Sequence, residues 1–401
     1  MRIGIVTVSF LPRLGGAVTQ TLLLHRHLRQ RGHHVEVFCP DLKKEGQYTE
    51  EGILVNRVTH PRVRGFEDHF SRLLLLARLR QAIQRRRRNF DVFITPEFNI
   101  GPLSLCLTRG TRKVGIYGAD LTFETLNVKR RQIIPYPQVL DHKLKPLGLK
   151  NYLLIALLNG LQYFMFKRLD HVIVLNREDE RRIRRHADDV SLISCLVANQ
   201  PAQAAVAQKP RERPQMATII GRAVSWKKIS ESIEVALDLE QGYPGLQIHY
   251  FGTGPEMPAI ESQYGDRIGI HKQLRNTQIL EWLGQSDITI NMSEYETFCI
   301  ANTEAMINRS LLVVKPLAEY RHYLQDQHNC LTLERPGSPE SIAKVQAAFA
   351  TGRVKAILDA AQQTVAEQMD LEKTVNQIES LLDRIAHGSP VGSGKSATPG
   401  P

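Results

Sequence analysis

The feature that most restricts the fold of this chain is a repeated alternation of short Val- and Ile-rich runs with longer segments of helical periodicity. Runs of this kind are typical of strands buried on both faces, and the helical segments cover a parallel sheet from both sides. The alternation therefore predicts an α/β fold. The first series contains one amphipathic helix, Thr19–Arg31, and five strands: Ile3–Ser9, His34–Cys39, Asp91–Thr95, Lys113–Tyr117 and His171–Leu175.

A second series begins after residues 201–214, a non-periodic stretch of Ala, Gln, Pro and charged residues that is typical of a linker. We therefore expect two doubly wound, Rossmann-like domains, at residues 1–200 and 215–387, facing each other across a cleft at the carboxyl ends of their sheets. A closing helix is predicted over Val354–His387, and residues 388–401 are predicted to be a disordered tail. The second series predicts strands Met216–Ile220, Leu246–Phe251, Ile268–Ile270, Ile288–Asn291 and Leu311–Val314, and helices Glu231–Leu239, Asn276–Leu283, Asn302–Asn308 and Pro339–Ala350.

Composition excludes several classes of protein. A chain of 401 residues that is 42% apolar and 23% charged has the make-up of a globular protein and not of a disordered or multi-span membrane protein. The longest apolar stretch, Tyr152–Phe166, is interrupted by Asn159 and Gln162, so no transmembrane segment is expected. The five cysteines are scattered and form no Cys-x-x-Cys pair. We therefore expect neither a zinc site nor a disulfide framework, and a cytoplasmic location.

Positive charge is concentrated in the first half of the chain. Residues 1–200 carry 33 Lys and Arg against 18 Asp and Glu, a net +15, whereas residues 201–401 carry 19 against 23, a net −4. Such a field favours an anionic partner. The basic, Leu-rich segments His69–Arg88 and Lys143–Lys167 could lie on an anionic membrane surface, or could be core-facing helices with a solvated basic side. Because no recognised module accompanies the charge, nucleic acid is not an expected partner.

Two glutamates stand out where a predicted strand leads into a predicted helix. Glu296 lies in the loop and Glu304 on the helix, with seven residues between them, so both carboxylates could face one ligand. Spacing alone leaves open that they are a solvated surface pair.

Other predicted loops reach the same edge of the second sheet. Arg222 and Lys227 follow one strand and place two cations there, although both could be ordinary surface charges. Gly252 and Gly254 follow the next strand and allow a close approach of the backbone. In the first domain, the Gly15-Gly16 turn follows the first strand.

Taken in order, these residues resemble the retaining nucleotide-sugar glycosyltransferases of family 4, whose two Rossmann-like domains form the GT-B fold. The resemblance covers nearly the whole chain and is strongest in the second domain. It implies transfer of a sugar from a UDP- or GDP-linked donor to a lipid-linked or glycan acceptor, with peripheral membrane association. For individual residues it implies that Glu296 approaches the sugar, Glu304 binds the ribose hydroxyls, Arg222 and Lys227 neutralise the diphosphate, and Gly15 and Gly16 lie against the phosphates.

The chemistry requires positive charge, because cleavage of a sugar–phosphate bond leaves a diphosphate with new negative charge. The chain contains no Asp-x-Asp motif of the kind that holds a metal in many glycosyltransferases. We therefore expect no metal and no further cofactor. Arg222, Lys227 and the amides that open the helix after Phe298, at Cys299 and Ile300, are predicted to stabilise the diphosphate instead.

The chain departs from the resembled family near the sugar. The family often has a histidine where this chain has Tyr117, and a phenol is a poorer base but can donate a hydrogen bond to a sugar hydroxyl. Asp120 is a candidate substitute, or else caps a turn in its loop.

Three further segments differ from the family pattern. Phe298-Cys299 stands where the family usually has Phe-Gly, Arg309-Ser310-Leu311 where it has Gly-x-Pro, and Lys315–Tyr320 where it has a glycine-rich turn. These changes are expected to crowd the sugar subsite and leave the donor sugar unspecified.

The departures leave two other functions open. One is a catalytically weak or inactive descendant that binds a nucleotide-sugar or a glycan as a partner or regulatory subunit. The other is a GT-B relative with a different reaction, such as a nucleotide-sugar epimerase or a phosphorylase.

Overall fold

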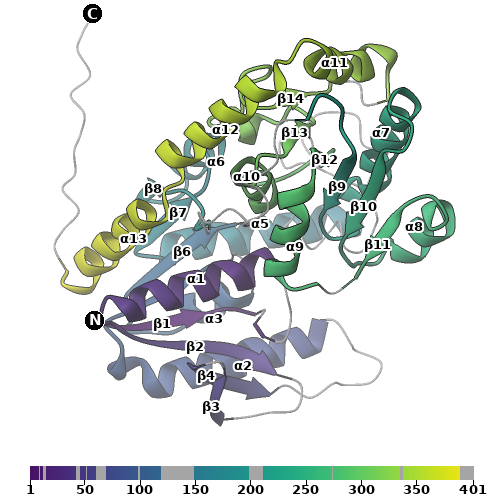
Figure 1. The fold of residues 1–401 in the computed structure, drawn as a ribbon. Helices are drawn as coiled ribbons and strands as arrows, with labels where there is room; N and C mark the ends of the chain where they lie inside the picture. The colour runs from purple at the N-terminus through teal and green to yellow at the C-terminus, as the bar shows by residue number, and fades with distance from the viewer. Residues whose placement is uncertain are drawn as a thin grey trace, which may run out of the picture.

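The computed structural model describes residues 1–8, 10–11, 15–41, 46–50, 52–59, 69–97, 100–118, 149–197, 211–272, 274–334 and 337–388. These residues form two α/β domains, each built around one largely parallel sheet (Figure 1). The first domain is purple to blue in the figure, and the second is teal to light green. The predicted pair of Rossmann-like domains is confirmed.

The first sheet has eight strands in the order β3-β4-β2-β1-β5-β6-β7-β8, and only the β3–β4 pair is antiparallel. The central strands are almost completely buried, as expected for apolar runs covered on both faces. The strands are β1 (Arg2–Val6), β2 (His34–Asp41), β3 (Gly46–Glu50), β4 (Ile53–Thr59), β5 (Val92–Thr95), β6 (Lys113–Tyr117), β7 (His171–Val174) and β8 (Val190–Leu192). The helices are α1 (Gly16–Gln30), α2 (His69–Arg86), η1 (Arg87–Asn89), α3 (Ile100–Cys106), α5 (Leu149–Arg168) and α6 (Arg177–Ile183).

The second sheet has six parallel strands in the order β11-β10-β9-β12-β13-β14. Its strands are β9 (Met216–Ile220), β10 (Gln247–Phe251), β11 (Gly269–His271), β12 (Ile288–Asn291), β13 (Leu311–Val314) and β14 (Leu331–Thr332). Its helices are η3 (Ser225–Lys227), α7 (Ile229–Gly242), α8 (Met257–Tyr264), α9 (Asn276–Gln285), α10 (Ile300–Ile307), η4 (Ala318–Tyr320), α11 (Pro339–Ala350) and α12 (Val354–Gln368).

The predicted closing helix over Val354–His387 is two helices instead of one. α12 ends at Gln368, and α13 (Leu371–Ala386) begins after Asp370, whose side chain accepts a 2.7 Å hydrogen bond from the amide of Lys373. This N-cap stabilises the start of a new helix and allows the chain to change direction.

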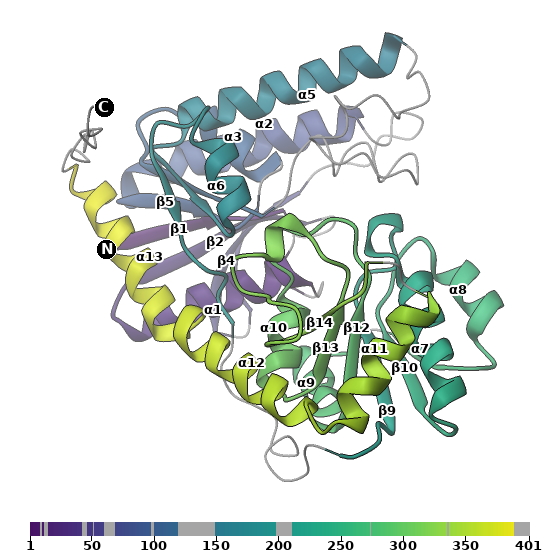
Figure 2. The same cartoon turned by 90° about the horizontal axis from the view of Figure 1, so that it is seen from above.

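The change of direction carries α13 onto the first domain, where it lies beside α1 (Figures 1 and 2). Arg31 at the end of α1 pairs with Glu372 at 2.6 Å and with Glu379, and His33 bonds to Glu379 at 2.6 Å. The buried face of α13 shares one hydrophobic core with β1, β5 and residues of both domains. The last helix among the described residues therefore completes the first domain.

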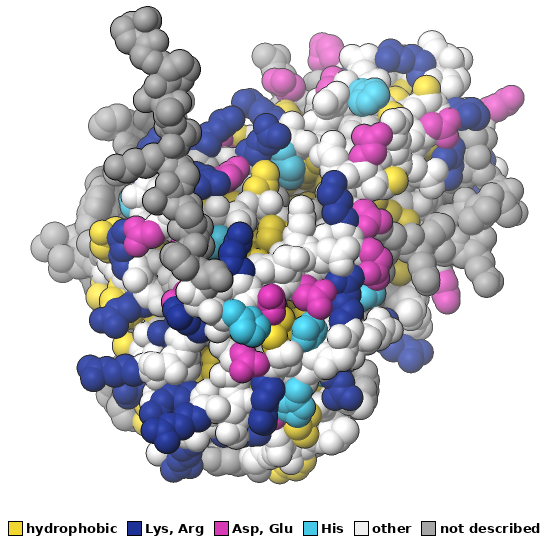
Figure 3. Space-filling model, turned by 90° about the vertical axis from the view of Figure 1, so that its left-hand side faces the viewer, with side chains coloured by type: hydrophobic (Ala, Val, Ile, Leu, Met, Phe, Trp, Pro, Cys, Tyr) yellow, Lys and Arg dark blue, Asp and Glu magenta, His cyan; other side chains and the backbone are white. Residues whose placement is uncertain are grey.

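Basic side chains dominate the lower part of the face shown in Figure 3, over the first domain. Part of the Arg85–Arg88 run is structural. Arg86 pairs with the buried Glu36 of β2, and Arg87 donates to the carbonyl of Gln84, whereas Arg85 and Arg88 are exposed. No helix in the described part of the chain combines the length and the apolar character needed to cross a bilayer.

Candidate functional site

The candidate site lies at the carboxyl edge of the second sheet, where the loops after β9, β10 and β12 meet. Since all strands of this sheet are parallel, these loops emerge at the same edge. The backbone amide of Glu294 donates a 2.8 Å hydrogen bond to the carbonyl of Trp226, which joins the loop after β12 to the loop after β9.

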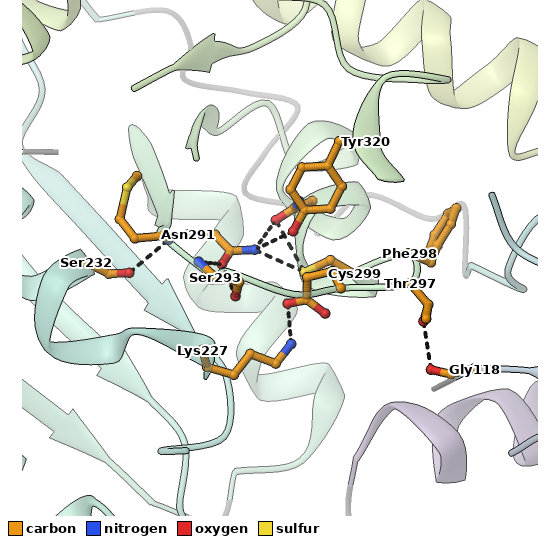
Figure 4. Close-up of polar contacts among 12 residues, drawn as sticks. Gly118, Lys227, Ser232, Asn291, Ser293, Thr297, Phe298, Cys299 and Tyr320 are labelled. Atoms are coloured by element: carbon orange, nitrogen blue, oxygen red, sulfur yellow. Dashed lines mark hydrogen bonds and ion pairs between the residues drawn. The ribbon is translucent and has the colours of Figure 1, made fainter. Parts of the chain in front are cut away.

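The central contact of the site is an ion pair between Lys227 Nζ and Glu296 Oε1 (Figure 4). Burial alone would lower the pKa of Lys227, but the Glu296 carboxylate raises it, and the net effect is a pKa above the usual value. The ammonium group is therefore charged throughout the physiological pH range. The structure brings Lys227 and Glu296 to the edge of the sheet where the sequence placed both, but the ion pair between them was not among the predictions.

Arg222 lies in the same tight turn as Lys227. Amides in this turn donate to carbonyls two or three residues earlier, from Val224 to Arg222 and from Lys227 to Val224. The Arg222 side chain is exposed, and within the described residues no acceptor is found for its guanidinium. The turn thus carries one cation that is paired and one that is open to solvent.

Gly252 and Gly254 support this turn from behind. A Cβ on Gly252 would lie 1.9 Å from the carbonyl oxygen of Gly221, and one on Gly254 would lie 2.3 Å from that of Ala223. Only glycine permits the backbone contact, which includes a 3.0 Å bond from the amide of Ala223 to the carbonyl of Thr253. These glycines therefore allow the loop after β10 to pack directly against the loop after β9, which carries Arg222.

A polar network centred on Asn291, at the end of β12, supports the loop after that strand (Figure 4). Its side-chain amide donates to Cys299 Sγ at 3.2 Å and to Asn302 Oδ1 at 2.8 Å, and its Oδ1 accepts from the amide and hydroxyl of Ser293. The network fixes both ends of the loop, and sequence reasoning did not identify it.

Helix α10 begins at the site with Cys299 as its N-cap residue. Cys299 has φ 63° and no side chain caps the helix, so the first-turn amides are oriented toward the loop without a side-chain acceptor from the described residues. Burial and the nearby Glu296 charge raise the pKa of the Cys299 thiol to about 12. The thiol is therefore neutral, and the helix end is a candidate site for an anion.

The Gly15-Gly16 turn approaches the same helix end from the first domain. Gly15, with φ 155°, precedes α1, and a Cβ on Gly16 would lie 3.4 Å from Ile300 Cδ1. Phe298 is buried, with its ring stacked on Tyr323 at 5.5 Å between centroids. The structure therefore brings Gly16 against Ile300, the residue that follows Phe298 and Cys299 at the start of α10.

Glu304 lies on α10 and is 8% exposed. Burial raises its pKa to about 7, while a 3.1 Å hydrogen bond from Asn276 Nδ2 to its Oε1 acts in the opposite direction. Asn276 is the first residue of α9 and was not among the predicted site residues.

Tyr117 is not placed with these residues. Its side chain is fully buried, its ring packs near Phe166, and its hydroxyl accepts a 2.6 Å hydrogen bond from Arg182 Nη2. This corrects the expectation that the phenol donates to a sugar hydroxyl. The pattern of the strand did not indicate which of its side chains faces the interior. Asp120 lies outside the described residues.

Arg309 does not crowd the site. It follows the opposite end of α10 in the left-handed conformation, with φ 55°, and its guanidinium bonds to Gln362 at 2.6 Å and to Asp359 at 2.7 Å on α12. Lys315 does lie near the loop, with its Nζ 3.4 Å from Glu294 Oε1. Of these two departures, only the one at Lys315 faces the site.

The loop after β12 also bonds to the first domain. Thr297 Oγ1 donates to the carbonyl of Gly118 at 2.7 Å, and the side-chain amide of Asn176 donates to the carbonyl of Thr297 at 2.7 Å. An N-cap signal at Asn176, directly after a predicted strand, was readable in the sequence, but its cross-domain bond was not.

Within the described residues, no group of three or more His, Cys, Asp or Glu side chains is placed to hold a metal ion.

Comparison with known families matches both domains. Residues 15–195 match the family described as "Glycosyl transferase 4-like domain", and residues 202–382 match "Glycosyl transferases group 1". The two matches are separated by residues 196–201, next to the start of the predicted linker at residue 201.

Individual relatives are distant in sequence. The alpha-monoglucosyldiacylglycerol synthase of Acholeplasma laidlawii is 23% identical over 352 residues, covering 82% of this chain and 84% of the relative. Among solved structures, sucrose-phosphate synthase from Thermosynechococcus elongatus superposes with a TM-score of 0.71 at 15% identity, over 97% of this chain and 100% of the other. HepE from Anabaena, in complex with UDP, superposes with a TM-score of 0.66 at 14% identity, over 96% and 100%. These structures share the fold of the chain.

Proposed function

Because the chain is a glycosyltransferase of the GT-B fold, with a glycosyl transferase 4-like domain followed by a glycosyl transferases group 1 domain, we propose that it transfers a sugar from a nucleoside diphosphate sugar to a lipid-linked or glycan acceptor. The anomeric configuration is retained and no metal ion is needed.

The observation that carries the proposal is the meeting of two cations and a helix N-terminus at one edge of the sheet. Lys227 is half-buried and paired with Glu296, Arg222 is exposed in the same turn, and α10 begins beside them. Such a set of groups fits a diphosphate, which is doubly anionic and chelated well by cations and backbone amides. The Anabaena relative, with the same fold, binds UDP.

During transfer, the bond between the sugar C1 and the phosphate oxygen breaks, and both of its electrons stay on the departing nucleoside diphosphate. The new charge on that oxygen develops next to Arg222 and the first-turn amides of α10. Because these groups are already in place, they stabilise the transition state more than the ground state.

The acceptor hydroxyl attacks C1 from the side that the phosphate leaves, which retains configuration. Its oxygen forms the new glycosidic bond, and its proton moves to the departing phosphate oxygen. Glu296, held by Lys227, lies against the sugar and orients it while positive charge develops at C1. The carboxylate of Glu304 accepts hydrogen bonds from the ribose hydroxyls, with Asn276 fixing its orientation.

The acceptor binds on the side of the first domain. The relative from Acholeplasma is named for a product on diacylglycerol, which favours a lipid-linked acceptor. Leu157 and Tyr163 on α5 are 59% and 52% exposed, close to the cations Lys167 and Arg168 in sequence. This helix is the best described candidate for contact with an anionic membrane. Replacing both apolar residues with Ser is expected to reduce co-sedimentation with anionic vesicles, and unchanged co-sedimentation would exclude this role.

The function is tested by incubating the purified chain with UDP-, GDP- and ADP-sugars and measuring released nucleoside diphosphate. We expect turnover with at least one donor, a loss of more than 100-fold in kcat for Glu296→Ala, and a weaker donor Kd for Glu304→Ala. Glu281→Gln, an exposed carboxylate on α9, serves as the matched control.

Other outcomes identify the alternatives. Thermal stabilisation by a nucleotide without turnover of any donor would indicate a binding protein with no transfer activity. Dependence of donor breakdown on inorganic phosphate would indicate a phosphorylase, and a change in the sugar without release of the nucleotide would indicate an epimerase.

A further inference from the structure

We propose that Asn176 and Thr297 are positioning residues that make the alignment of the Glu296 loop depend on closure of the two domains. The inference rests on the proposed function, since it assigns a role to the loop that carries Glu296. Neither residue contacts the reacting atoms in this proposal, and both act through the backbone next to Glu296.

Thr297 is the only one of three consecutive loop residues that bonds to the first domain in the described contacts. The side chain of Glu296 is held by Lys227, and the carbonyl of Phe298 accepts a 2.7 Å bond from Tyr323 Oη, both within the second domain. Between them, Thr297 donates to Gly118 and accepts from Asn176. The peptide that follows Glu296 is therefore fixed from across the cleft (Figure 4).

The two contacts belong to one closed ring of hydrogen bonds. Asn176 bonds to Asp179, Asp179 Oδ1 accepts from Arg182 at 2.8 Å, and Arg182 donates to the hydroxyl of Tyr117 at 2.6 Å. Tyr117 is the covalent neighbour of Gly118, whose carbonyl accepts from Thr297 and closes the ring. The ring explains why Tyr117 is buried: it supports the acceptor of the cross-domain bond.

The ring requires an amide at position 176. Asn176 Oδ1 accepts from the amide of Asp179 at 2.7 Å, and its Nδ2 donates to both Asp179 Oδ2 and the carbonyl of Thr297, each at 2.7 Å. Both hydrogens of the amide and its oxygen are used, and the side chain is fully buried. An aspartate here would face two acceptors without a hydrogen to donate, whereas a serine could still cap α6 but could not reach Thr297.

Opening of the cleft must break both bonds to Thr297, because Gly118 and Asn176 belong to the first domain and Thr297 to the second. The loop would then be held only by the contacts of its own domain. Glu296 would reach its position against the sugar only when the acceptor side is in place, which limits donor breakdown in the open form.

The test uses the full-length chain with Thr297→Val and Asn176→Ser. We expect kcat for transfer to fall about tenfold in each, the effect of one lost hydrogen bond, with nucleotide Kd within twofold of the wild type. The loss in the double variant should be smaller than the product of the single losses, because both act on one loop. Thr297→Ser keeps the hydroxyl and should recover most of the rate.

Thr108→Val is the matched control, because it removes a buried threonine hydroxyl that also donates to a backbone carbonyl, that of Ser104, away from the cleft. A kcat within twofold of the wild type for both Thr297→Val and Asn176→Ser would overturn the inference. A parallel fall of kcat, nucleotide affinity and Tm would also overturn it, since that result indicates a role in folding only.

Small-angle X-ray scattering separates failure of this inference from failure of the proposed function. Both variants are expected to give a larger radius of gyration than the wild type and Thr108→Val, because the closed form loses cross-domain bonds. This readout needs no donor. If the wild type breaks down no donor, the proposed function fails. The scattering still decides whether Asn176 and Thr297 hold the domains closed, because an unchanged radius of gyration in the variants would contradict that role.

Discussion

Cys299 occupies a backbone conformation that suits glycine better than any other residue. Its φ of 63° lies in the left-handed region, where a Cβ contacts the following carbonyl and costs about 1–2 kcal/mol. The thiol offsets part of this cost through its hydrogen bonds with Asn291 and Asn302. The residue at the start of α10 is therefore held by its side chain in a strained backbone, at the end of the helix that opens onto the candidate site.

This strain can be measured with two substitutions at one position. Both Cys299→Gly and Cys299→Ala lose the thiol bonds, but only the glycine also relieves the strain. We expect Cys299→Gly to be more stable than Cys299→Ala by about 1 kcal/mol, as measured by urea unfolding. Equal stability of the two variants would show that the backbone at 299 is not strained.

Glu304 gives the stability of the protein a distinct pH dependence. Burial raises its folded-state pKa to about 7 from the ordinary 4.5. Below about pH 4.5 the Glu304 carboxyl is protonated in both the folded and the unfolded chain, and its contribution to stability is fully present. This contribution is lost as the pH rises through 7, because ionising the buried carboxyl in the folded chain costs more free energy than ionising it in the unfolded chain.

Replacement of Glu304 by Gln should remove this dependence. The neutral amide keeps an oxygen for Asn276, so the variant is expected to be more stable than the wild type at pH 8 by up to roughly 3 kcal/mol, and similar to it at pH 4.5. Urea unfolding at the two pH values measures the difference. If the difference in stability between Glu304→Gln and the wild type is the same at pH 8 and at pH 4.5, the raised pKa assigned to Glu304 is wrong.

At the level of single residues, the sequence indicated the charged side chains of the site but few of the polar side chains that hold them in place. The shared location of Lys227 and Glu296 could be predicted because the carboxyl ends of all strands in a parallel sheet, here β9 and β12, lie at one edge. The bonds of Asn291, Asn276 and Thr297 could not, because they join atoms whose distance depends on how the loops pack. Tyr117 was misplaced for the same reason.

Among the elements, α2 is anchored at its end to the first sheet by Arg86. The guanidinium bonds to the 1% exposed Glu36 of β2 and to Asn56 of β4, at 2.5 Å for the latter. Burial alone would raise the pKa of Glu36, but the bonds from Arg86, His34 and Asn56 bring it below the usual value. The carboxylate therefore stays charged inside the domain and depends on its cation.

Arg86→Ala is expected to destabilise the protein by about 3 kcal/mol, because it leaves Glu36 buried with a weaker set of partners. The neighbouring Arg85→Ala, which removes an exposed charge, should change stability by less than about 0.5 kcal/mol. The measurement is urea unfolding of both variants. If adding Glu36→Gln to Arg86→Ala does not restore part of the lost stability, the buried charge of Glu36 is not the cause of the destabilisation.

Elements with continuous apolar runs were predicted well, and polar or very short ones were not. β12 and β13 are buried along their whole length and fall where the sequence placed them. The hairpin of β3 and β4 was missed because β3 reads Gly-Gln-Tyr-Thr-Glu, and β14 because it has two residues. The break between α12 and α13 was missed because helical periodicity continues on both sides of Asp370.

At the scale of the whole molecule, the two domains are joined by the crossing of α13 as well as by the linker. Arg31, His33 and the acids of α13 form a cluster of ion pairs over a shared apolar core. The bonds from His33 and Arg31 hold the pKa of Glu379 below its usual value against the effect of burial. The docking of α13 is therefore expected to weaken as the pH falls through that lowered pKa.

Arg31→Ala should loosen α13 selectively. The loss of its pairs with Glu372 and Glu379 is expected to cost about 1 kcal/mol and to raise amide hydrogen exchange in α13 about fivefold, with α12 unchanged. Lys355→Ala, which removes an exposed pair within α12, is the control. Equal exchange in α13 for the wild type and Arg31→Ala would show that the apolar contacts alone dock this helix.

The return of α13 to the first domain also bears on how hybrid enzymes should be assembled from this fold. A chimaera that takes its first domain from one parent and its second domain from another, joined only in the linker, would place a foreign helix against α1 and β5. Such a chimaera needs a second junction near Met369, so that α13 comes from the same parent as the first domain whose hydrophobic core it completes.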